Sequence, residues 1–111
     1  MKRRSTSRNQ ITAAEHAQMP KYTIGVVSRL LSLHPQALRR YEEAGLLEPA
    51  RQAGKNRLYS DQDIAALEEI AELSDLGVNV VGIRYILQMR QEVQEARERQ
   101  HLAEKDRQEQ K

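Results

Sequence analysis

Amide and basic side chains recur at helical spacing in the first half of the chain. Gln36, Arg39, Arg40 and Glu43 stand at positions i, i+3, i+4 and i+7 of one expected helix face. Arginine donates hydrogen bonds to guanine edges or phosphates, and glutamine pairs with adenine. We therefore predict that Gln36, Arg39 and Arg40 contact DNA from a helix in the major groove. The alternative is an ordinary solvated helix face.

A second group of polar and basic side chains follows between residues 51 and 59. Phosphate contacts from such a group give affinity and register without reading base sequence. Thr23 is a further candidate, because backbone N–H groups at the start of a helix can hold a phosphate. Glu42 is expected to form an ion pair within the chain, since phosphates repel it. The predicted phosphate contacts of the second group are Arg51, Lys55, Asn56, Arg57 and Tyr59.

Two short helices must hold the first group of side chains. Thr23 can cap a helix in which Ile24, Val27, Leu30 and Leu31 recur at helical spacing and which ends near Ser32. A second helix is expected to start at His34-Pro35, since proline is favoured at the first helical position. His34 is expected to have a structural role, with DNA contact or pH sensing as alternatives. Ala37, Leu38 and Tyr41 then face inward, and Gly45 suits a left-handed cap. This pattern predicts a helix-turn-helix.

A hairpin and two further helices are expected after the helix-turn-helix. Residues 46–59 predict a two-stranded wing, with Pro49 on an edge strand and Gly54 in the loop. Ser60 and Asp63 form a capping box for a third helix, which ends at Gly77. Asn79 is expected to cap a fourth helix. The predicted inward positions are Ile64, Leu67, Ile70, Ala71 and Leu73 in the third helix and Val80, Ile83, Ile86 and Leu87 in the fourth.

A heptad seam can be traced from the fourth helix towards the end of the chain. Its positions follow a 3-4 spacing, and the segment contains neither Gly nor Pro. This pattern predicts an inter-chain coiled coil and hence a homodimer, the alternative being a lone solvated helix that frays after about Arg97. The predicted dimerisation residues are Ile86, Met89, Val93, Ala96 and Gln100, followed at the same spacing by Ala103.

Charge is distributed unevenly over three expected regions. The chain has 111 residues and a net charge of +2. Residues 61–111 carry seven basic and twelve acidic groups, so the positive charge lies in the first half. This asymmetry favours a polyanion-binding face beside a separate partner-binding segment. We predict a flexible basic arm at 1–20, which contacts phosphates or has no role, a DNA-binding domain at 21–88 and a dimerisation helix at 89–111.

Composition argues against several classes of protein. The chain contains no cysteine, so thiolate metal sites and thiol redox sensing are not expected. No apolar run reaches the length of a membrane span, and we expect a soluble cytoplasmic protein. We find no Gly-rich phosphate loop, no paired acids in an evident pocket and no nucleophile with a base. Neither enzymatic activity nor a cofactor or metal is therefore expected.

Three segments in order resemble the MerR family of bacterial transcription factors. They are an L-R-x-Y-E segment at residues 38–42, G-L-L-x-P-x-R at 45–51 and R-x-Y at 57–59. The resemblance runs from about Tyr22 to Leu87. It implies a mainly α, winged helix-turn-helix fold with a small β-hairpin wing and a C-terminal dimerisation helix. Metal-sensing relatives carry cysteine ligands, and this chain contains no cysteine. Drug-sensing relatives carry an added ligand domain, which is not expected here.

Within this family the chain is most similar to the HspR group of heat-shock repressors, on residues 33–42 and 77–87. That resemblance implies a homodimer with an antiparallel coiled coil, bound to inverted repeats upstream of chaperone operons. It also implies the chaperone DnaK as a corepressor. Three alternatives remain at this point: a MerR-type activator, an excisionase-like architectural DNA-binding protein, and an adaptor that uses the coiled coil without DNA.

Overall fold

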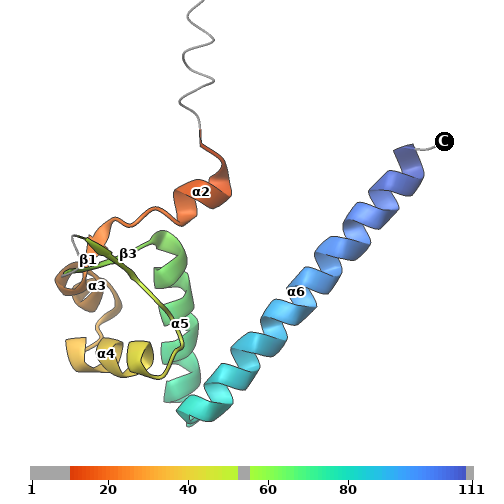
Figure 1. Cartoon of the computed structure of the whole chain (residues 1–111). Helices are drawn as coiled ribbons and strands as arrows, with labels where there is room; N and C mark the ends of the chain where they lie inside the picture. Colours follow the sequence, from red (N-terminus) through yellow and green to blue (C-terminus); the bar gives the residue numbers. More distant parts are fainter. Residues whose placement is uncertain (1–10, 53–55, 110–111) are drawn as a thin grey trace, which may run out of the picture. The chain divides into compact units, whose positions relative to one another are not determined.

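The computed structural model describes residues 11–52 and 56–109 and divides into two compact units. The first ends at Glu72 and the second begins at Leu73. The elements, in chain order, are α2 (Ala13–Ala17), β1 (Tyr22–Thr23), α3 (Ile24–Leu31), α4 (Pro35–Glu43), β2 (Ala50–Gln52), β3 (Asn56–Tyr59), α5 (Asp61–Asp75) and α6 (Val80–Glu109) (Figure 1). The mainly helical fold with a small β wing is as predicted.

The helix-turn-helix forms where the capping residues predicted it. Thr23 Oγ1 accepts a hydrogen bond from the backbone N of Val26 at 3.4 Å and caps α3. Ser32 then adopts a left-handed conformation, φ 53°, which ends that helix. His34 caps α4 through its ring, because Nδ1 accepts from the backbone N of Gln36 at 3.0 Å. The imidazole therefore satisfies a helix-start donor that a serine or threonine hydroxyl often satisfies, which is the structural role expected of it.

The end of α4 requires a glycine. Gly45 has φ 79°, a backbone conformation that costs other residues free energy because of their Cβ atom. The reversal brings the backbone N of Leu46 within 3.0 Å of the carbonyl oxygen of Tyr41. This bond satisfies one of the carbonyls that a helix end leaves unpaired. The chain then leaves α4 towards the wing.

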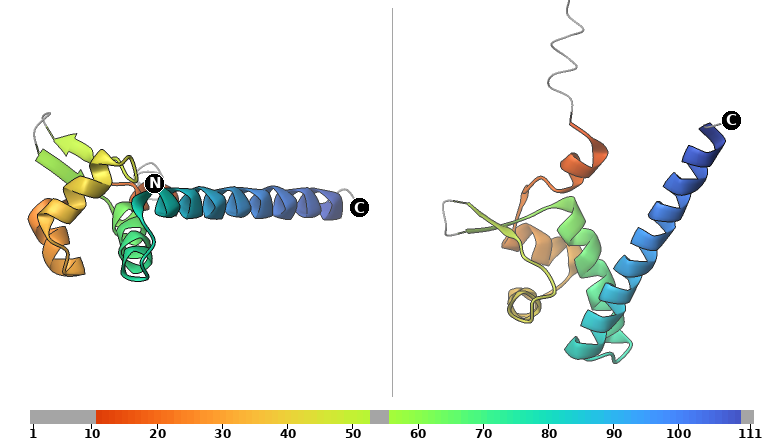
Figure 2. Two further views of the ribbon diagram at one scale, coloured as in Figure 1. Left: turned by 90° about the horizontal axis from the view of Figure 1, so that it is seen from below. Right: turned by 45° about the vertical axis from the view of Figure 1, so that its right-hand side comes forward.

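The sheet has three strands, where the sequence predicted a two-stranded hairpin. Its order is β1-β3-β2, and both neighbours pair antiparallel with β3. Figure 2 shows β2 and β3 side by side as the wing. The added strand, β1, pairs Tyr22 with Tyr59. Two residues are too few to show the alternation by which a strand is recognised, so sequence reasoning missed β1. Pro49 directly precedes β2, which is an edge strand as expected.

The core of the first unit joins both helices of the helix-turn-helix to the sheet. α3 packs against α4 and against β3. Val27 from α3, Leu38 from α4 and Tyr59 from β3 are each at most 1% exposed. Ala37 and Tyr41 are also buried, which confirms the predicted inner face of α4. The remaining buried residues of this unit are Leu47, Ser60, Leu67 and Ile70.

The start of α5 carries the predicted capping box. The backbone N of Asp63 donates to Ser60 Oγ, and the backbone N of Ser60 donates to Asp63 Oδ2, both at 3.0 Å. Two donors of the helix start are thereby satisfied reciprocally. Along α5, Leu67, Ile70 and Leu73 are buried, while Ile64 and Ala71 are partly buried. The predicted apolar stripe of α5 is therefore confirmed at Leu67, Ile70 and Leu73.

The second unit consists mainly of one long helix. Asn79 caps α6, as predicted, through Oδ1, which accepts from the backbone N of Gly82 at 2.9 Å. α6 then runs unbroken for 30 residues (Figure 2), so no break in secondary structure marks the predicted boundary at 88/89. After Gly82 the described helix contains neither glycine nor proline. Ile83 is buried, but Val80 is 37% exposed and the prediction that it faces inward was wrong.

The N-terminal segment contains a helix that sequence reasoning missed. Structure was expected to begin near Tyr22, but α2 forms at residues 13–17. Glu15 N donates to Thr12 Oγ1 at 3.0 Å, and Thr12 N donates to Glu15 Oε1 at 2.8 Å. The signal was present in the sequence as a Thr-x-x-Glu capping box. Residues 1–10 of the predicted arm lie outside the described residues.

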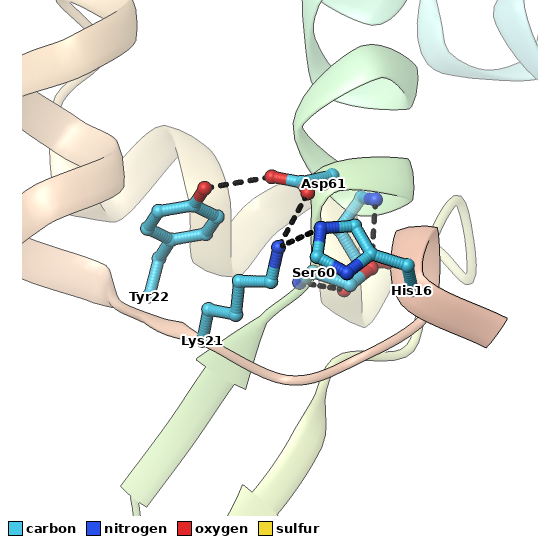
Figure 3. A network of polar contacts seen from close by, with 6 residues as sticks. His16, Lys21, Tyr22, Ser60 and Asp61 are labelled. Atoms are coloured by element: carbon cyan, nitrogen blue, oxygen red, sulfur yellow. Dashed lines mark hydrogen bonds and ion pairs between the residues drawn. The ribbon is translucent and has the colours of Figure 1, made fainter. Parts of the chain in front are cut away.

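Asp61 connects this N-terminal segment to the first turn of α5 (Figure 3). Its carboxylate accepts from Lys21 Nζ and from the Tyr22 hydroxyl, both at 2.7 Å. Lys21 Nζ also lies 3.1 Å from Nε2 of His16 in α2. The bond from Lys21 and then that from Tyr22 lower the pKa of Asp61 from its usual range, and the bond to Asp61 raises the pKa of Tyr22. These contacts link α2, β1 and α5.

Replacing Asp61 by Asn is expected to lower the thermal unfolding midpoint at pH 7. A carboxyl whose pKa is depressed by folding stabilises the protein above its unfolded pKa of about 3.9, and this contribution is lost as pH falls through the folded value. The difference between wild type and Asp61→Asn should therefore shrink as pH falls below about 4. Thermal melts followed by circular dichroism from pH 7 to pH 2.5 measure this difference in unfolding midpoint. The control is Asp106→Asn, at an exposed position of α6. A difference that does not change with pH would contradict the assignment.

Candidate nucleic-acid interface

The exposed face of α4 carries the three side chains predicted to contact DNA. Gln36, Arg39 and Arg40 are all exposed, whereas Leu38 and Tyr41 on the opposite face are buried. Gln36 Oε1 accepts from Arg39 Nη1 at 3.5 Å, so these two side chains lie together. The buried face holds α4 against α3 and leaves the polar face outward. This is the geometry that a recognition helix needs to insert into a major groove.

Glu42 joins α4 to the wing. Arg57 Nε lies 2.7 Å from Oε2 and 2.9 Å from Oε1 of this carboxylate, and Arg51 Nη2 lies 3.1 Å from Oε1. Glu42 is only 14% exposed, and the hydrogen bond to it is the largest cause of the raised pKa of Arg57. The predicted intramolecular ion pair of Glu42 is confirmed. Sequence reasoning did not identify its two partners, because they lie on different strands.

Tyr59 was predicted to touch phosphate and does not lie where it can do so. Its side chain is 1% exposed, and burial raises the pKa of its hydroxyl. The hydroxyl is buried and has no hydrogen-bond partner among the described residues. α3 packs against β3, and Tyr59 belongs to the core of this unit together with Val27 and Leu38. The prediction was wrong because it rested on residue type, whereas the packing of α3 against β3 decides which side chains of this strand are buried.

Three of the other predicted phosphate contacts lie on strands of the first unit. Arg51 is 44% exposed in β2, Arg57 is 24% exposed in β3, and Asn56 is exposed at the start of β3. Lys55 lies outside the described residues. Thr23 is exposed at the start of α3, where its hydroxyl is used as a cap. Their contacts with DNA stay predictions.

Two further properties of the described residues bear on function. Across residues 11–52 and 56–109, no three His, Cys, Asp or Glu side chains gather as they would around a metal ion. Over the same ranges, no helix combines the length and apolar character needed to cross a membrane.

Comparison with known proteins places this architecture in a family. The family described as "MerR HTH family regulatory protein" matches residues 22–90, which run from β1 into α6. The chain belongs to the MerR family. It is 43% identical over 81 residues to a Streptomyces coelicolor protein described as heat shock protein HspR, covering 72% of this chain and 54% of that protein. It is 40% identical over 77 residues to the transcriptional regulator GlnR of Bacillus anthracis, covering 69% and 60%. The chain thus spans 54% and 60% of the length of these two relatives.

Solved MerR-family structures share the fold. The regulator PbrR691 from Ralstonia metallidurans CH34, solved with lead(II), matches with a TM-score of 0.59 and 32% identity over 65% of this chain and 57% of its own. HiNmlR, a MerR family regulator lacking the sensor domain and bound to promoter DNA, matches with a TM-score of 0.58 and 25% identity over 61% and 52%. The chain therefore shares both the family and the fold of these regulators. No enzymatic family is among these relatives. α2 precedes the part of the chain that matches the family.

Proposed function

We propose that the chain is a repressor of heat-shock and chaperone genes that binds an inverted-repeat operator as a homodimer. The observation that carries the proposal is the exposed face of α4, with Gln36, Arg39 and Arg40, in a chain 43% identical to HspR over 72% of its length. A helix that buries one face and exposes amide and guanidinium groups on the other suits direct readout in the major groove. Repression follows when the bound protein occludes RNA polymerase.

The wing adds affinity that does not depend on base sequence. Arg51 and Arg57 come from adjacent strands and lie beside the C-terminal part of α4 through Glu42. Phosphates that flank the major groove are the acceptors that such cations meet when a recognition helix is inserted. Base contacts from α4 and phosphate contacts from the wing thus act in one docking geometry.

The homodimer rests on α6. Met89 is 56% exposed and Val93 is 49% exposed in the single chain, and both lie on the 3-4 seam with Ile86, Ala96 and Gln100. Large apolar side chains at this spacing are stabilised when a second helix covers them. A two-fold dimer presents two recognition helices to two half-sites, which explains why the operator is expected to be an inverted repeat.

DnaK is the proposed corepressor, by resemblance to the HspR group. The segment after residue 60 carries twelve acidic and seven basic groups, so its surface differs in charge from the DNA-binding segment. A partner protein can therefore contact this segment while the basic residues remain on DNA.

A binding titration tests the proposal directly. Labelled duplex from the region upstream of the chain's own gene is titrated at about 50 and 200 mM salt, with and without DnaK. Saturable binding to an inverted repeat is expected, weakening by about 10³-fold or more between these salt concentrations for six or more phosphate contacts, and tightening with DnaK. Tight binding that DnaK does not change would contradict the corepressor. Absence of a preferred duplex under every condition would contradict the operator proposal.

A further inference from the structure

Glu42 is an acidic residue on a helix face that is proposed to contact DNA. Its carboxylate lies on the recognition helix, one position away from the exposed Glu43 and two from Arg40. A negative charge on a DNA-facing element reduces affinity, because phosphates repel it. Yet Glu42 is 14% exposed and contacts both wing arginines, at 2.7 Å for Arg57 and 3.1 Å for Arg51. The carboxylate is therefore held in two ion pairs within the chain.

The sheet register shows what the carboxylate does for the wing. Arg51 and Arg57 are direct partners across β2 and β3. Like charges placed directly opposite in an antiparallel pair destabilise it. Glu42 accepts hydrogen bonds from both, so one carboxylate offsets the repulsion and attaches both strands to α4. The wing and the recognition helix are joined through this side chain.

The way in which Arg57 is held leaves part of it available. Among the described residues, Arg57 donates to Glu42 through Nε alone, to both carboxylate oxygens. The guanidinium is planar, so holding Nε restricts the plane of the whole group. Its two terminal nitrogens then form a fork of the kind that binds phosphate by two parallel hydrogen bonds. Arg57 remains 24% exposed, which permits that contact.

We propose that Glu42 is a positioning residue, which orients Arg57 so that its two terminal nitrogens bind a DNA phosphate. The same side chain couples the wing to the recognition helix. The inference rests on DNA binding by this face, as proposed above. It predicts a change in DNA affinity opposite in direction to the change that charge alone would cause. Removing the negative charge strengthens DNA binding if Glu42 only repels phosphate, and weakens it if Glu42 orients the fork.

Two substitutions and their combination separate these roles. Glu42→Gln keeps the size of the side chain and removes its charge. Arg57→Lys keeps the positive charge and removes the planar fork, so the orientation given by Glu42 no longer matters. Binding of wild type, Glu42→Gln, Arg57→Lys and the double variant is measured on the upstream duplex and on a random-sequence duplex at low salt. The random duplex serves because phosphate contacts do not depend on sequence.

Glu42→Gln is expected to weaken binding about tenfold in the wild-type background, the loss of one oriented charge-assisted contact. In the Arg57→Lys background it should leave binding unchanged or tighten it. Equal weakening in both backgrounds would show a purely structural role and overturn the inference. Tighter binding in the wild-type background would also overturn it. If circular dichroism shows that Glu42→Gln does not fold, Glu42→Asp replaces it. The shorter side chain withdraws the carboxylate from Arg57, so a loss of about tenfold in affinity is again expected.

The same measurements distinguish failure of this inference from failure of the proposed function. If the wild type binds the random duplex but shows no preference for the upstream duplex, the operator proposal fails. The comparison of the four variants on the random duplex still decides the role of Glu42. If the wild type prefers the upstream duplex and Glu42→Gln has the same effect in both backgrounds, only the positioning role fails. If the wild type binds neither duplex, the operator proposal and the positioning role of Glu42 are both wrong.

Discussion

Replacing both Arg39 and Arg40 by Ala is expected to weaken operator binding by about two orders of magnitude. Each oriented arginine contact with a base edge contributes about 1–3 kcal/mol, and 1.4 kcal/mol corresponds to a tenfold change in Kd. Both side chains are exposed on α4, so the fold should remain intact, as surface substitutions change stability by about 0.5 kcal/mol or less. Fluorescence anisotropy with the operator duplex measures the loss of affinity.

A matched pair controls for charge alone. Lys105→Ala with Arg107→Ala also removes two positive charges, from exposed positions in α6. This control should change operator affinity only slightly, and thermal melts should show both double variants folded. Unchanged affinity of the Arg39 and Arg40 variant would overturn the assignment of α4 as the recognition helix. An equal loss in the control would mean that the chain responds only to net charge.

Replacing Val93 by Glu is expected to dissociate the dimer and to weaken operator binding by about a hundredfold. Val93 is 49% exposed in the single chain and lies within the seam, so the proposed dimer places it against a second copy. A carboxylate buried there without a partner is strongly unfavourable. Loss of the second head removes the gain from joining two binding modules, which is about 10²–10⁴-fold in affinity. Sedimentation equilibrium gives the mass, and anisotropy gives the affinity.

The control for this change is Gln88→Glu, which adds the same charge to α6 outside the seam. It should remain dimeric and bind the operator as the wild type does. If Val93→Glu stays dimeric at micromolar concentration, the seam is misplaced. If it becomes monomeric yet binds with unchanged affinity, the two half-sites are not read cooperatively.

Most of the correct predictions of helix starts rest on interactions between residues that lie only a few positions apart in the sequence. Thr23, His34, Ser60 and Asn79 each mark a helix start, and each side chain accepts a bond from a backbone N–H two or three positions later. Capping depends on such short separations, so the pattern is visible in the sequence alone. The Thr12–Glu15 pair carried the same kind of signal for α2 and was overlooked.

The candidate DNA-binding face was predictable only in part. Helical periodicity assigned Leu38 and Tyr41 to the core and Arg39 and Arg40 to the surface, and the structure confirms this. In the wing, residue type alone suggested phosphate contacts. A basic or aromatic side chain at a strand position is equally consistent with an exposed or a buried orientation, because the face depends on which neighbours the strand acquires.

Apart from α2, the sequence by itself determined the helices, the caps at Thr23, Ser60 and Asn79, the turn at Gly45 and the family. These depend on local hydrogen bonds and on an apolar periodicity that neighbouring residues display. Tertiary structure decided that β1 pairs with β3, that Tyr59 is core and that one carboxylate of α4 holds two wing arginines. The physical reason is distance along the chain: Tyr22 meets Tyr59 and Glu42 meets Arg57 only after folding brings distant segments together, and no local pattern encodes such pairs.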